Sequence, residues 1–311
     1  MTYRTPTWPT AASWPIARSR PRPARRGVSV VPSVHVTAPQ VVLLGTGDPL
    51  NHERAQASLA LQLVETAAGA GGGETLLIDT SSGVVLLRQL HAAGIVLALI
   101  RHIFISHRHF DHAGGLAPLL VALSAIPEAT VTVYAPPVTR AALHNLLAMS
   151  IPGVEEWMGG RLRWRTLIPG RAVAAGRVVV TPFAVAHGLE CVGFRAEAGG
   201  ATIVFSADTR PCPALVAYAT GADLLIHEAY GLNTTAAEAH RFGHATAQDA
   251  GCAARAADAG HLVLTHLRGS LHADPAALAS EAATVFDGPV TPARDLDVVH
   301  VRPPPTARAS Q

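Results

Sequence analysis

A short histidine-rich segment constrains this chain more than any other feature. It places three imidazoles and a carboxylate within six residues, in the order His107-Arg108-His109-Phe110-Asp111-His112. Residues 101–106 before it predict a strand, and a helix is predicted from near Ala113 to Pro127. Side chains two residues apart on an extended chain point to the same side, so His107 and His109 can point the same way. Asp111 and His112 then point in a second direction beside the first. Because imidazole and carboxylate groups suit zinc, manganese or iron, the segment predicts two adjacent metal positions rather than a solvated loop.

Short β-branched runs alternate with alanine- and leucine-rich runs over most of the chain, which is typical of an α/β fold. Strands are predicted at residues 41–44, 57–64, 76–78, 101–106, 131–134, 223–226 and 262–265, with a strand-rich stretch over 161–205. Helices are predicted at residues 84–92, 113–127, after Pro137, and at 245–259 and 275–285. This order predicts a sandwich or a wound sheet.

The composition favours a globular protein in a reducing compartment. Hydrophobic residues make up 49% of the 311 positions and charged residues 15%, which is enough apolar material for a sizeable core. The longest apolar runs, 94–100 and 116–123, are shorter than the roughly 18 to 20 residues that cross a bilayer. Cys191, Cys212 and Cys252 are widely spaced and indicate neither a disulfide framework nor a thiolate zinc site. We therefore expect a cytoplasmic protein without a membrane partner.

The two ends of the chain differ in composition from the rest. Residues 1–38 contain six prolines, six arginines and no acidic residue, which predicts a disordered leader. Residues 303–311 predict a disordered tail. One domain is therefore expected over residues 39–302.

All 24 lysine or arginine positions are arginine. The lack of lysine excludes Schiff-base chemistry, a P-loop lysine and a lysine general base. Six of the arginines precede residue 28, so the remainder of the chain contains 18 arginines and 22 acidic residues. This mildly acidic body argues against a broad basic face that would grip a long nucleic acid.

The histidine-rich segment resembles the H-x-H-x-D-H motif of the metallo-β-lactamase superfamily at every defined position. Further ligand positions of that family follow in the expected order, each near the end of a predicted strand. The ligand set that the resemblance implies is His107, His109 and His187 for one metal ion, Asp111, His112 and His266 for the other, and Asp208 between them. Asp79 matches an early aspartate of the family that supports the metal loop from behind.

The same resemblance implies a four-layer αβ/βα sandwich, with two β-sheets inside and the metal ions at the edge where the strand-end loops converge. It implies two divalent cations per chain, with Zn²⁺ as the first choice and Mn²⁺ or Fe²⁺ as alternatives. Two cations about 3.5 to 4 Å apart would bind a bridging water, lower its pKa toward neutrality and make it the nucleophile. The implied reaction is hydrolysis, and the fold alone does not say which ester is cut.

The residues around and after Asp208 are similar to the ribonuclease Z branch of this family, which includes tRNA 3′-end-processing enzymes and related phosphodiesterases. The matching segments are residues 44–47, 208–211, 221–229, 243–248 and 264–266. The resemblance covers roughly residues 40–270 and implies a phosphodiesterase, with Asp111 and His244 as catalytic side chains. His244 would assist proton transfer to the leaving oxygen. His227 and Glu228 are expected to shape the adjoining loop rather than to bind metal.

The chain departs from the tRNA-processing members between His187 and Asp208. Only 20 residues separate these positions, and they predict a plain hairpin with Gly199-Gly200 at its turn, where those members carry an extended arm that grips RNA. With the acidic body, this disfavours tRNA relative to small or accessible phosphodiesters. The segment 161–165 places arginines at alternate positions, which predicts either a phosphate-binding strand face or an ordinary solvent-exposed one.

Phe110 is a second departure, because tRNA-processing members commonly have a small residue there. With Phe110, the loop is locally similar to acyl-homoserine-lactone lactonases, which usually offer a tyrosine soon after the bridging aspartate. This chain has Thr209-Arg210-Pro211 at that point. Hydrolysis of a lactone, sulfate ester or thioester at the same site is therefore the alternative activity, and a catalytically silent metal-binding module is the remote one.

The expected partners are small-molecule or nucleic-acid phosphodiesters. The helix after Pro137 carries an apolar row formed by Leu143, Leu146, Leu147 and Met149. That row predicts either a homodimer surface or a part of the core.

Overall fold

Strands and helices alternate along the chain as the residue pattern predicts. The computed structural model describes residues 38–63, 73–269 and 274–301. The predicted tail 303–311 and the predicted leader, apart from Ala38, lie outside these residues. The domain boundaries at 39 and 302 therefore stay predictions.

The first sheet of the described residues has seven strands in the order β14-β1-β2-β3-β4-β5-β6. The strands are β1 (Pro39–Gly45), β2 (Ser58–Leu63), β3 (Thr75–Ile78), β4 (Ile100–Phe104), β5 (Val131–Ala135), β6 (Leu162–Thr166) and β14 (Val298–His300). Antiparallel pairs join β14, β1, β2 and β3, and parallel pairs continue from β3 to β6. The parallel half requires crossover connections, which the helices between these strands provide.

The second described sheet has the order β13-β12-β11-β10-β9-β8-β7. Its strands are β7 (Val173–Ala175), β8 (Val178–Ala184), β9 (Val192–Ala198), β10 (Ala201–Phe205), β11 (Leu224–Glu228), β12 (Leu262–Thr265) and β13 (Val290–Pro292). The pairs from β7 to β10 are antiparallel, and those from β10 to β13 are parallel. The second sheet thus repeats the arrangement of the first.

Alternate residues of the inner strands face two different cores. In β1, Val41 and Leu43 belong to the cluster between the two sheets, whereas Val42 and Leu44 belong to the cluster beneath the helices of the first sheet. A strand that is buried on both faces in this way has an unbroken apolar sequence. This explains why the run 41–44 contains only valine and leucine.

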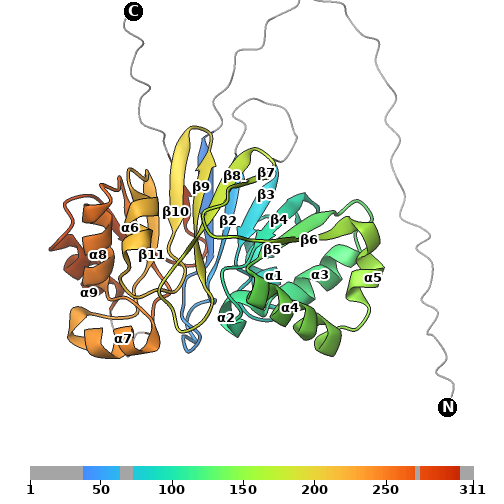
Figure 1. The fold of residues 1–311 in the computed structure, drawn as a ribbon, viewed down its shortest axis with the longest axis horizontal. Helices are drawn as coiled ribbons and strands as arrows, with labels where there is room; N and C mark the ends of the chain where they lie inside the picture. The colour runs from blue at the N-terminus through green and yellow to red at the C-terminus, as the bar shows by residue number, and fades with distance from the viewer. Residues whose placement is uncertain (1–37, 64–72, 270–273, 302–311) are drawn as a thin grey trace, which may run out of the picture. The chain divides into compact units, whose positions relative to one another are not determined.

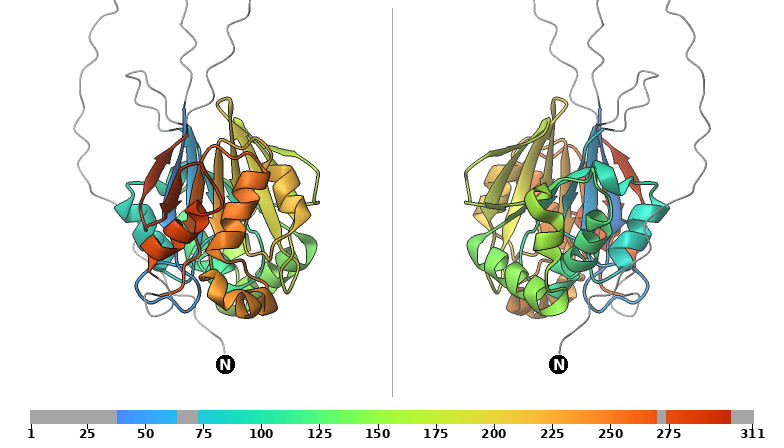
Figure 2. Two further views of the ribbon diagram at one scale, coloured as in Figure 1. Left: turned by 90° about the vertical axis from the view of Figure 1, so that its left-hand side faces the viewer. Right: turned by 90° about the vertical axis from the view of Figure 1, so that its right-hand side faces the viewer.

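Helices cover the outer face of each sheet, as Figures 1 and 2 show. Those of the first sheet are α1 (Val85–Ala92), α3 (Leu116–Ser124), α4 (Pro137–Ser150) and α5 (Val154–Met158). Those of the second sheet are α6 (Pro213–Ala219), α8 (Ala247–Ala256) and α9 (Pro275–Ala283). The predicted four-layer αβ/βα sandwich is therefore confirmed. Two short helices, α2 (Phe110–Ala113) and α7 (Ala236–Phe242), lie at the lower end of the sheets in Figure 1.

The helix predicted over residues 113–127 is instead two helices. The first, α2, begins at Phe110, and α3 begins only at Leu116. A Cβ atom at Gly115 would lie 1.9 Å from the carbonyl oxygen of Thr80, so the chain crosses the loop after β3 at a distance that only glycine allows. The break gives Asp111 and His112 a helical turn of their own at the end of β4.

The hairpin predicted after His187 is confirmed. Strands β9 and β10 pair from Ala198 and Ala201 inward, and Gly199 and Gly200 take the positive φ angles of +57° and +81° that a two-residue hairpin turn requires. All residues from 188 to 207 are described, and they form this short hairpin and the loops beside it.

Helix α4 is partly core and partly surface. Leu143 and Leu147 are buried, whereas Met149 is 85% exposed. The predicted homodimer stays a prediction. None of the described helices combines the length and the apolar character needed to span a membrane.

Candidate metal centre

The predicted metal ligands follow the ends of four strands and meet between the two sheets. His107 and His109 follow β4, His187 follows β8, Asp208 follows β10, and His266 follows β12. Asp111 and His112 lie in the short helix α2. Strand-end loops of both sheets therefore deliver polar side chains to one place.

The seven residues form two adjacent groups. The ligand atoms of His107, His109, His187 and Asp208 all lie within 4.8 Å of one another, and the same holds for those of Asp111, His112 and His266. Asp208 contacts both groups, because its Oδ2 lies 3.6 Å from His107 Nε2 and its Oδ1 lies 3.2 Å from His112 Nε2. The structure thus brings together every metal ligand that the sequence predicts.

Hydrogen bonds behind the rings orient three of the imidazoles. His107 Nδ1 donates to Ser106 Oγ at 2.9 Å, and His187 Nδ1 donates to the carbonyl of Gly243 at 2.9 Å. His112 Nδ1 donates to Asp79 Oδ2 at 2.7 Å. In each case Nε2 is the nitrogen that faces Asp208. Such bonds fix the tautomer that leaves the inner nitrogen free to bind a metal ion.

Asp79 supports the metal loop from behind, as the resemblance implied. Its carboxylate is fully buried and accepts hydrogen bonds from the Ser106 backbone N–H and from Ser106 Oγ, both at 2.7 Å, in addition to that from His112. Asp79 has a φ of 57°, a left-handed conformation that aspartate and asparagine tolerate better than most residues. One buried carboxylate therefore holds two neighbouring parts of the loop.

The donor set fits a divalent cation. Among the described residues, His112 Nε2 and Asp208 Oδ1 are buried and have no hydrogen-bond partner, which is costly unless another group binds them. Burial alone would lower the pKa of His112, but the charges of Asp208, Asp111 and Asp79 outweigh burial and raise it well above its ordinary value. The carboxylates therefore favour a positive charge at this point, which a bound metal ion would supply.

The protonation states also suit metal binding. Burial lowers the pKa of both His107 and His109, so these rings stay neutral, and the neutral ring is the form that binds metal. Burial alone would raise the pKa of Asp111, but the charge of His112 and hydrogen bonds from His112 and His266 hold it below its ordinary value. The pKa of Asp208 is lowered in the same way, by His112 and His266 against the effect of burial.

His244 lies beside both metal-ligand groups and is held by Glu228. Its Nδ1 is 3.1 Å from Glu228 Oε2, and its ring stacks on Tyr230 and His266 with centroid distances of 4.9 and 5.4 Å. Burial alone would lower the pKa of His244, but the charge and hydrogen bonds of Glu228 raise it to about 9. A ligand atom of His244 also lies within 4.8 Å of those of Asp208 and His266.

Glu228 shapes the surrounding loops, as the sequence indicated. It is the last residue of β11 and is buried, and it accepts hydrogen bonds from the backbone N–H groups of Thr209 and Ala245. The neighbouring His227 points its Nδ1 at the carbonyl of Glu228. Glu228 therefore ties the loop after Asp208 to the segment that carries His244.

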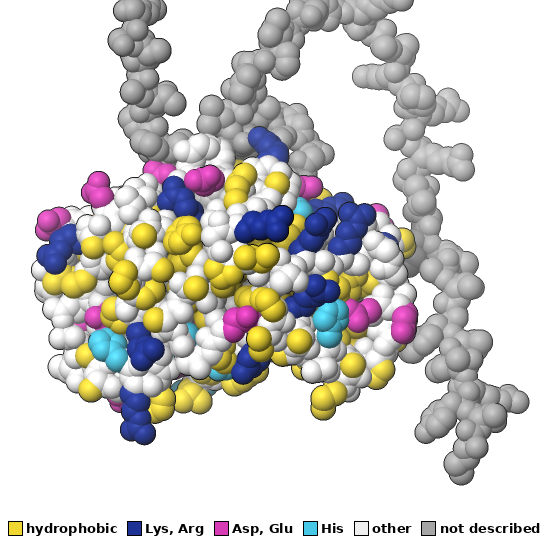
Figure 3. Space-filling model, viewed as in Figure 1, with side chains coloured by type: hydrophobic (Ala, Val, Ile, Leu, Met, Phe, Trp, Pro, Cys, Tyr) yellow, Lys and Arg dark blue, Asp and Glu magenta, His cyan; other side chains and the backbone are white. Residues whose placement is uncertain are grey.

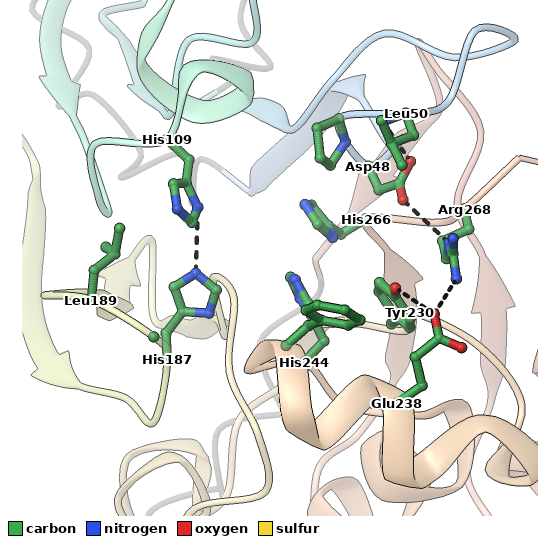
Figure 4. A pocket seen from close by; sticks show the side chains of 13 residues that line it. Asp48, Leu50, His109, His187, Leu189, Tyr230, Glu238, His244, His266 and Arg268 are labelled. Atoms are coloured by element: carbon green, nitrogen blue, oxygen red, sulfur yellow. Dashed lines mark hydrogen bonds and ion pairs between the residues drawn. The ribbon is translucent and has the colours of Figure 1, made fainter.

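A cavity of about 550 Å³ opens next to the metal-ligand groups. Its lining comprises Asp48, Pro49, Leu50, His109, His187, Gly188, Leu189, Tyr230, Glu238, Phe242, His244, His266 and Arg268. Figure 4 shows His109 and His187 on one side of this cavity and Arg268, with Tyr230 and Glu238, on the other. Asp48 and Arg268 were not predicted as site residues, although Asp48 directly follows the matched segment 44–47 and Arg268 comes two residues after His266.

Arg161 does not belong to the strand face that the arginine pattern predicted. It lies before β6, and its guanidinium donates to the backbone carbonyls of Ser124 and Ile126 at the end of α3 and of Trp157 in α5. Of the three arginines in this segment, Arg163 and Arg165 lie on β6 itself and are exposed. On the face of the molecule that Figure 3 shows, arginine side chains gather over β6 and β7. Arg161 is therefore a helix cap rather than a phosphate ligand.

A model of one family, described as the beta-lactamase superfamily domain, matches residues 74–267, which is more than half of the chain. The matched range contains the seven predicted metal ligands. The superfamily that the motif at residues 107–112 indicated is therefore confirmed.

Ribonuclease Z proteins are similar to this chain over most of its length. Ribonuclease Z of Mycobacterium bovis is 26% identical over 294 residues, which cover 85% of this chain and 99% of the relative. Ribonuclease Z of Haloferax volcanii is 28% identical over 271 residues, which cover 72% of this chain and 84% of the relative. The predicted similarity to the ribonuclease Z branch is thus confirmed.

Solved structures share the fold. The metallo-beta-lactamase fold protein YhfI from Bacillus subtilis aligns with a TM-score of 0.70 at 23% identity, over 85% of this chain and 99% of that one. The short form of human tRNase Z aligns with a TM-score of 0.66 at 24% identity, over the same shares of the two chains. From its two packed sheets, its clustered histidines and this family match, we conclude that the chain belongs to the beta-lactamase superfamily.

Proposed function

We propose that this chain is a dinuclear metal-dependent phosphodiesterase. The chain is a metal-dependent hydrolase by its family and its site, and the relatives named ribonuclease Z support a phosphodiester as the substrate. The observation that carries the proposal is one arrangement. Asp208 contacts both metal-ligand groups, and His244 lies beside them on the wall of an open cavity.

The two groups would hold one divalent ion each, most simply zinc, because their donors are imidazole nitrogens and carboxylate oxygens. When bound, the two ions supply a water nucleophile of lowered pKa and neutralise the charge that develops on the phosphoryl oxygens. The hydrogen bonds from Ser106, Asp79 and Gly243 hold the ligand rings in place for this purpose.

Three side chains, Asp111, Glu228 and His244, orient the attacking water and transfer a proton to the leaving group. Asp111 stays ionised because its pKa is held low, so its carboxylate accepts a hydrogen bond from the attacking water and orients it. Glu228 accepts the Nδ1 proton of His244, which leaves Nε2 as the nitrogen that carries a proton toward the cavity. As the phosphorus–oxygen bond breaks, His244 donates that proton to the leaving oxygen.

The substrate is a small or sterically accessible phosphodiester. The segment between His187 and Asp208 is a short hairpin, so it offers no long arm for the body of a folded RNA. Cys191, Cys212 and Cys252 are all free, which fits a reducing compartment and supports a cytoplasmic location.

The test is hydrolysis by the metal-loaded protein of four substrates: bis(p-nitrophenyl) phosphate, p-nitrophenyl sulfate, a homoserine lactone and a 3′-extended tRNA. We expect activity on the phosphodiester. Exclusive activity on the lactone or the sulfate would contradict the phosphodiesterase proposal and would favour the alternative ester hydrolase. Turnover of the tRNA would enlarge the substrate range to folded RNA.

The role of His244 is tested by His244→Ala on two diesters with different leaving groups. A dinucleotide has a poor leaving group and needs the proton, so we expect its turnover to fall about 10²- to 10⁴-fold. Bis(p-nitrophenyl) phosphate releases a stable anion, so its loss should be much smaller. His240→Ala is the matched control, because His240 also pairs with a carboxylate, that of Asp249, but does not line the cavity. Equal losses on both diesters would contradict proton donation by His244.

A further inference from the structure

A second cavity lies at the end of the first sheet where its parallel strands begin, whereas the metal ligands follow the strand ends. This cavity has a volume of about 220 Å³. Its lining comprises Glu74, Arg101, His102, Thr130, Val131, Thr132, Arg161 and Arg163. His102 in β4 precedes the metal ligand His107 by five residues, which corresponds to about 16 Å along an extended chain. One phosphate group cannot reach both places, so the second cavity is separate from the proposed active site.

Polar side chains line this cavity on the inner face of the sheet. The strand register pairs His102 of β4 with Thr132 of β5, and Thr132 with Arg163 of β6, so the three side chains point to the same face. In the next row of the same face, Phe104 and Tyr134 are buried in the cluster between the two sheets. The inner face therefore changes from apolar to polar at the cavity.

The second cavity carries a net positive charge. Arg101, Arg161 and Arg163 line it together with one carboxylate, that of Glu74. The pKa of His102 is lowered, chiefly by burial, so its ring is neutral at pH 7 and does not change this balance. Three guanidinium groups and one carboxylate leave a charge of +2 around the cavity, although the chain from residue 28 onward is mildly acidic. Such a concentration of positive charge attracts an anion.

Two of the guanidinium groups have N–H groups free to bind an anion. Arg163 makes no hydrogen bond or ion pair with any other described residue. Arg101 donates from Nη1 to the Glu128 carbonyl and to Thr130 Oγ1, and its other N–H groups have no partner in the described parts of the chain. Arg161 uses Nη1 and Nη2 for backbone carbonyls, so it contributes its charge alone. Guanidinium N–H groups form short, strong hydrogen bonds with the oxygens of phosphate.

Glu74 selects between oxyanions. Its carboxylate repels an anion that has lost all its protons, but it accepts a hydrogen bond from an anion that keeps one. At neutral pH inorganic phosphate keeps a P–OH group, whereas sulfate has none. The turn after β7 packs against this side of the cavity, because a Cβ atom at Gly176 would overlap Glu74 Oε2 and would lie 3.7 Å from His102 Nε2. Glycine in this turn therefore leaves the space that the carboxylate occupies.

We propose that the second cavity binds inorganic phosphate, with Arg101 and Arg163 donating to its oxygens and Glu74 accepting its P–OH group. The volume suffices for the anion and a few water molecules, since one water takes about 30 Å³ in the liquid. A phosphate monoester fits less well, because its second pKa of about 6 leaves it mostly without a proton at pH 7.5. The inference goes beyond the proposed function, because this phosphate is not the substrate.

The test is calorimetric titration of the metal-loaded protein at pH 7.5 with inorganic phosphate, sulfate and methyl phosphate. The metal centre can bind these anions too, so the contribution of the second cavity is the binding that the original chain shows and Arg163→Gln loses. We expect that contribution to be about tenfold stronger for phosphate than for sulfate, because sulfate forfeits one hydrogen bond to a charged group. Methyl phosphate should also bind more weakly than phosphate.

Three variants locate the anion. Arg163→Gln should weaken phosphate binding at the second cavity by about tenfold or more, since it removes charged donors. Arg165→Gln is the matched control, because Arg165 is also exposed, two residues further along the same face of β6, and does not line the cavity. It should leave phosphate binding unchanged. Glu74→Gln should lose the preference for phosphate over sulfate, because the glutamine NH₂ group can donate to sulfate.

Thermal unfolding checks that each variant folds and gives a second measure of binding. Phosphate should raise the unfolding temperature of the original chain and of Arg165→Gln more than that of Arg163→Gln, because a ligand stabilises the folded state that binds it.

Three results would overturn the inference: equal phosphate binding by the original chain and Arg163→Gln, an equal loss in Arg165→Gln, or an unchanged preference for phosphate over sulfate in Glu74→Gln. None of these results depends on hydrolysis. A chain that binds phosphate in the second cavity but cleaves no diester would contradict the proposed function and leave this site standing.

Discussion

Asp79→Asn should weaken metal binding without direct contact to the metal-ligand atoms. Asparagine keeps the left-handed backbone conformation at φ 57° and one carbonyl oxygen, but it replaces the second carboxylate oxygen by an NH₂ group. That oxygen, Oδ2, now accepts from Ser106 Oγ and His112 Nδ1. The hydroxyl of Ser106 can rotate and become an acceptor, whereas His112 must give up its Nδ1 proton.

The consequence for the metal centre follows from the tautomer. The neutral ring of His112 would then carry its proton on Nε2, the atom that lies 3.2 Å from Asp208 Oδ1 and 3.3 Å from Asp111 Oδ2. A metal ion bound at Nε2 would leave the ring proton on Nδ1, where the asparagine NH₂ group cannot accept it, whereas Asp79 Oδ2 accepts it in the original chain. Loss of such a supporting carboxylate typically costs 10- to 100-fold in metal affinity, or about 1.4 to 2.7 kcal/mol. The variant should also lose about 1.5 to 3 kcal/mol of unfolding free energy, the worth of one hydrogen bond to a charged group.

Competition with a chromophoric chelator measures the zinc affinity, and urea unfolding of the metal-free protein measures the stability. Asp223→Asn is the control, because Asp223 accepts a hydrogen bond from the Thr202 backbone N–H and is not among the residues of the metal-ligand groups. The control should lose stability and keep its zinc affinity. A zinc affinity of Asp79→Asn within about threefold of the original chain would refute the tautomer argument.

Three further outcomes are expected. Gly193→Ala should destabilise the fold by about 1 to 3 kcal/mol in urea unfolding, because its Cβ would lie 2.5 Å from Phe183 Cζ, whereas Gly160→Ala, with nothing within 4 Å, should be nearly neutral. A comparable loss at both glycines would contradict the packing argument. Burial lowers the pKa of His227 below 6.5, so as the pH falls through this value the unfolded chain binds a proton before the folded chain does. The free energy of unfolding therefore decreases as the pH falls. His227→Asn keeps an N–H group for the carbonyl of Glu228 but removes the titrating ring. The free energy of unfolding of this variant should therefore fall less between pH 7.5 and 5.5 than that of the original chain, and an equal fall in both proteins would refute this. Removing metal with a chelator should lower the unfolding temperature, since an ion at 1,000 times its Kd stabilises the fold by about 4 kcal/mol; an unchanged temperature would show that the cluster binds no ion in the folded chain.

The fold could be predicted where the residue pattern is local. The run 41–44 is apolar throughout because both faces of β1 are buried, and Gly199-Gly200 marks a hairpin turn by its own conformational freedom. The strands β13 and β14 have only three residues each and no clear alternation, so the sequence does not reveal them. The break between α2 and α3 depends on Thr80, which contacts Gly115 only in the folded chain.

In the candidate site, too, the local part could be predicted and the contacts between distant residues could not. The histidine-rich segment at 107–112 carries its chemistry in six consecutive residues, and the order of the later ligands was readable only through the family resemblance. The carboxylate–guanidinium contact between Asp48 and Arg268 joins residues that are 220 positions apart, and no local pattern predicts it. Arg161 was misplaced because alternation along a strand says nothing about the free carbonyls at the end of α3, which are its partners.

The number of metal ions per chain tests the central claim most directly. Elemental analysis of the purified, zinc-reconstituted protein should find about two ions per chain, one for each ligand group. Asp208→Ala removes the carboxylate that contacts both groups, so its metal content should fall below that of the original chain. Fewer than one ion per chain in the reconstituted original protein would contradict the dinuclear site and, with it, the proposed hydrolysis.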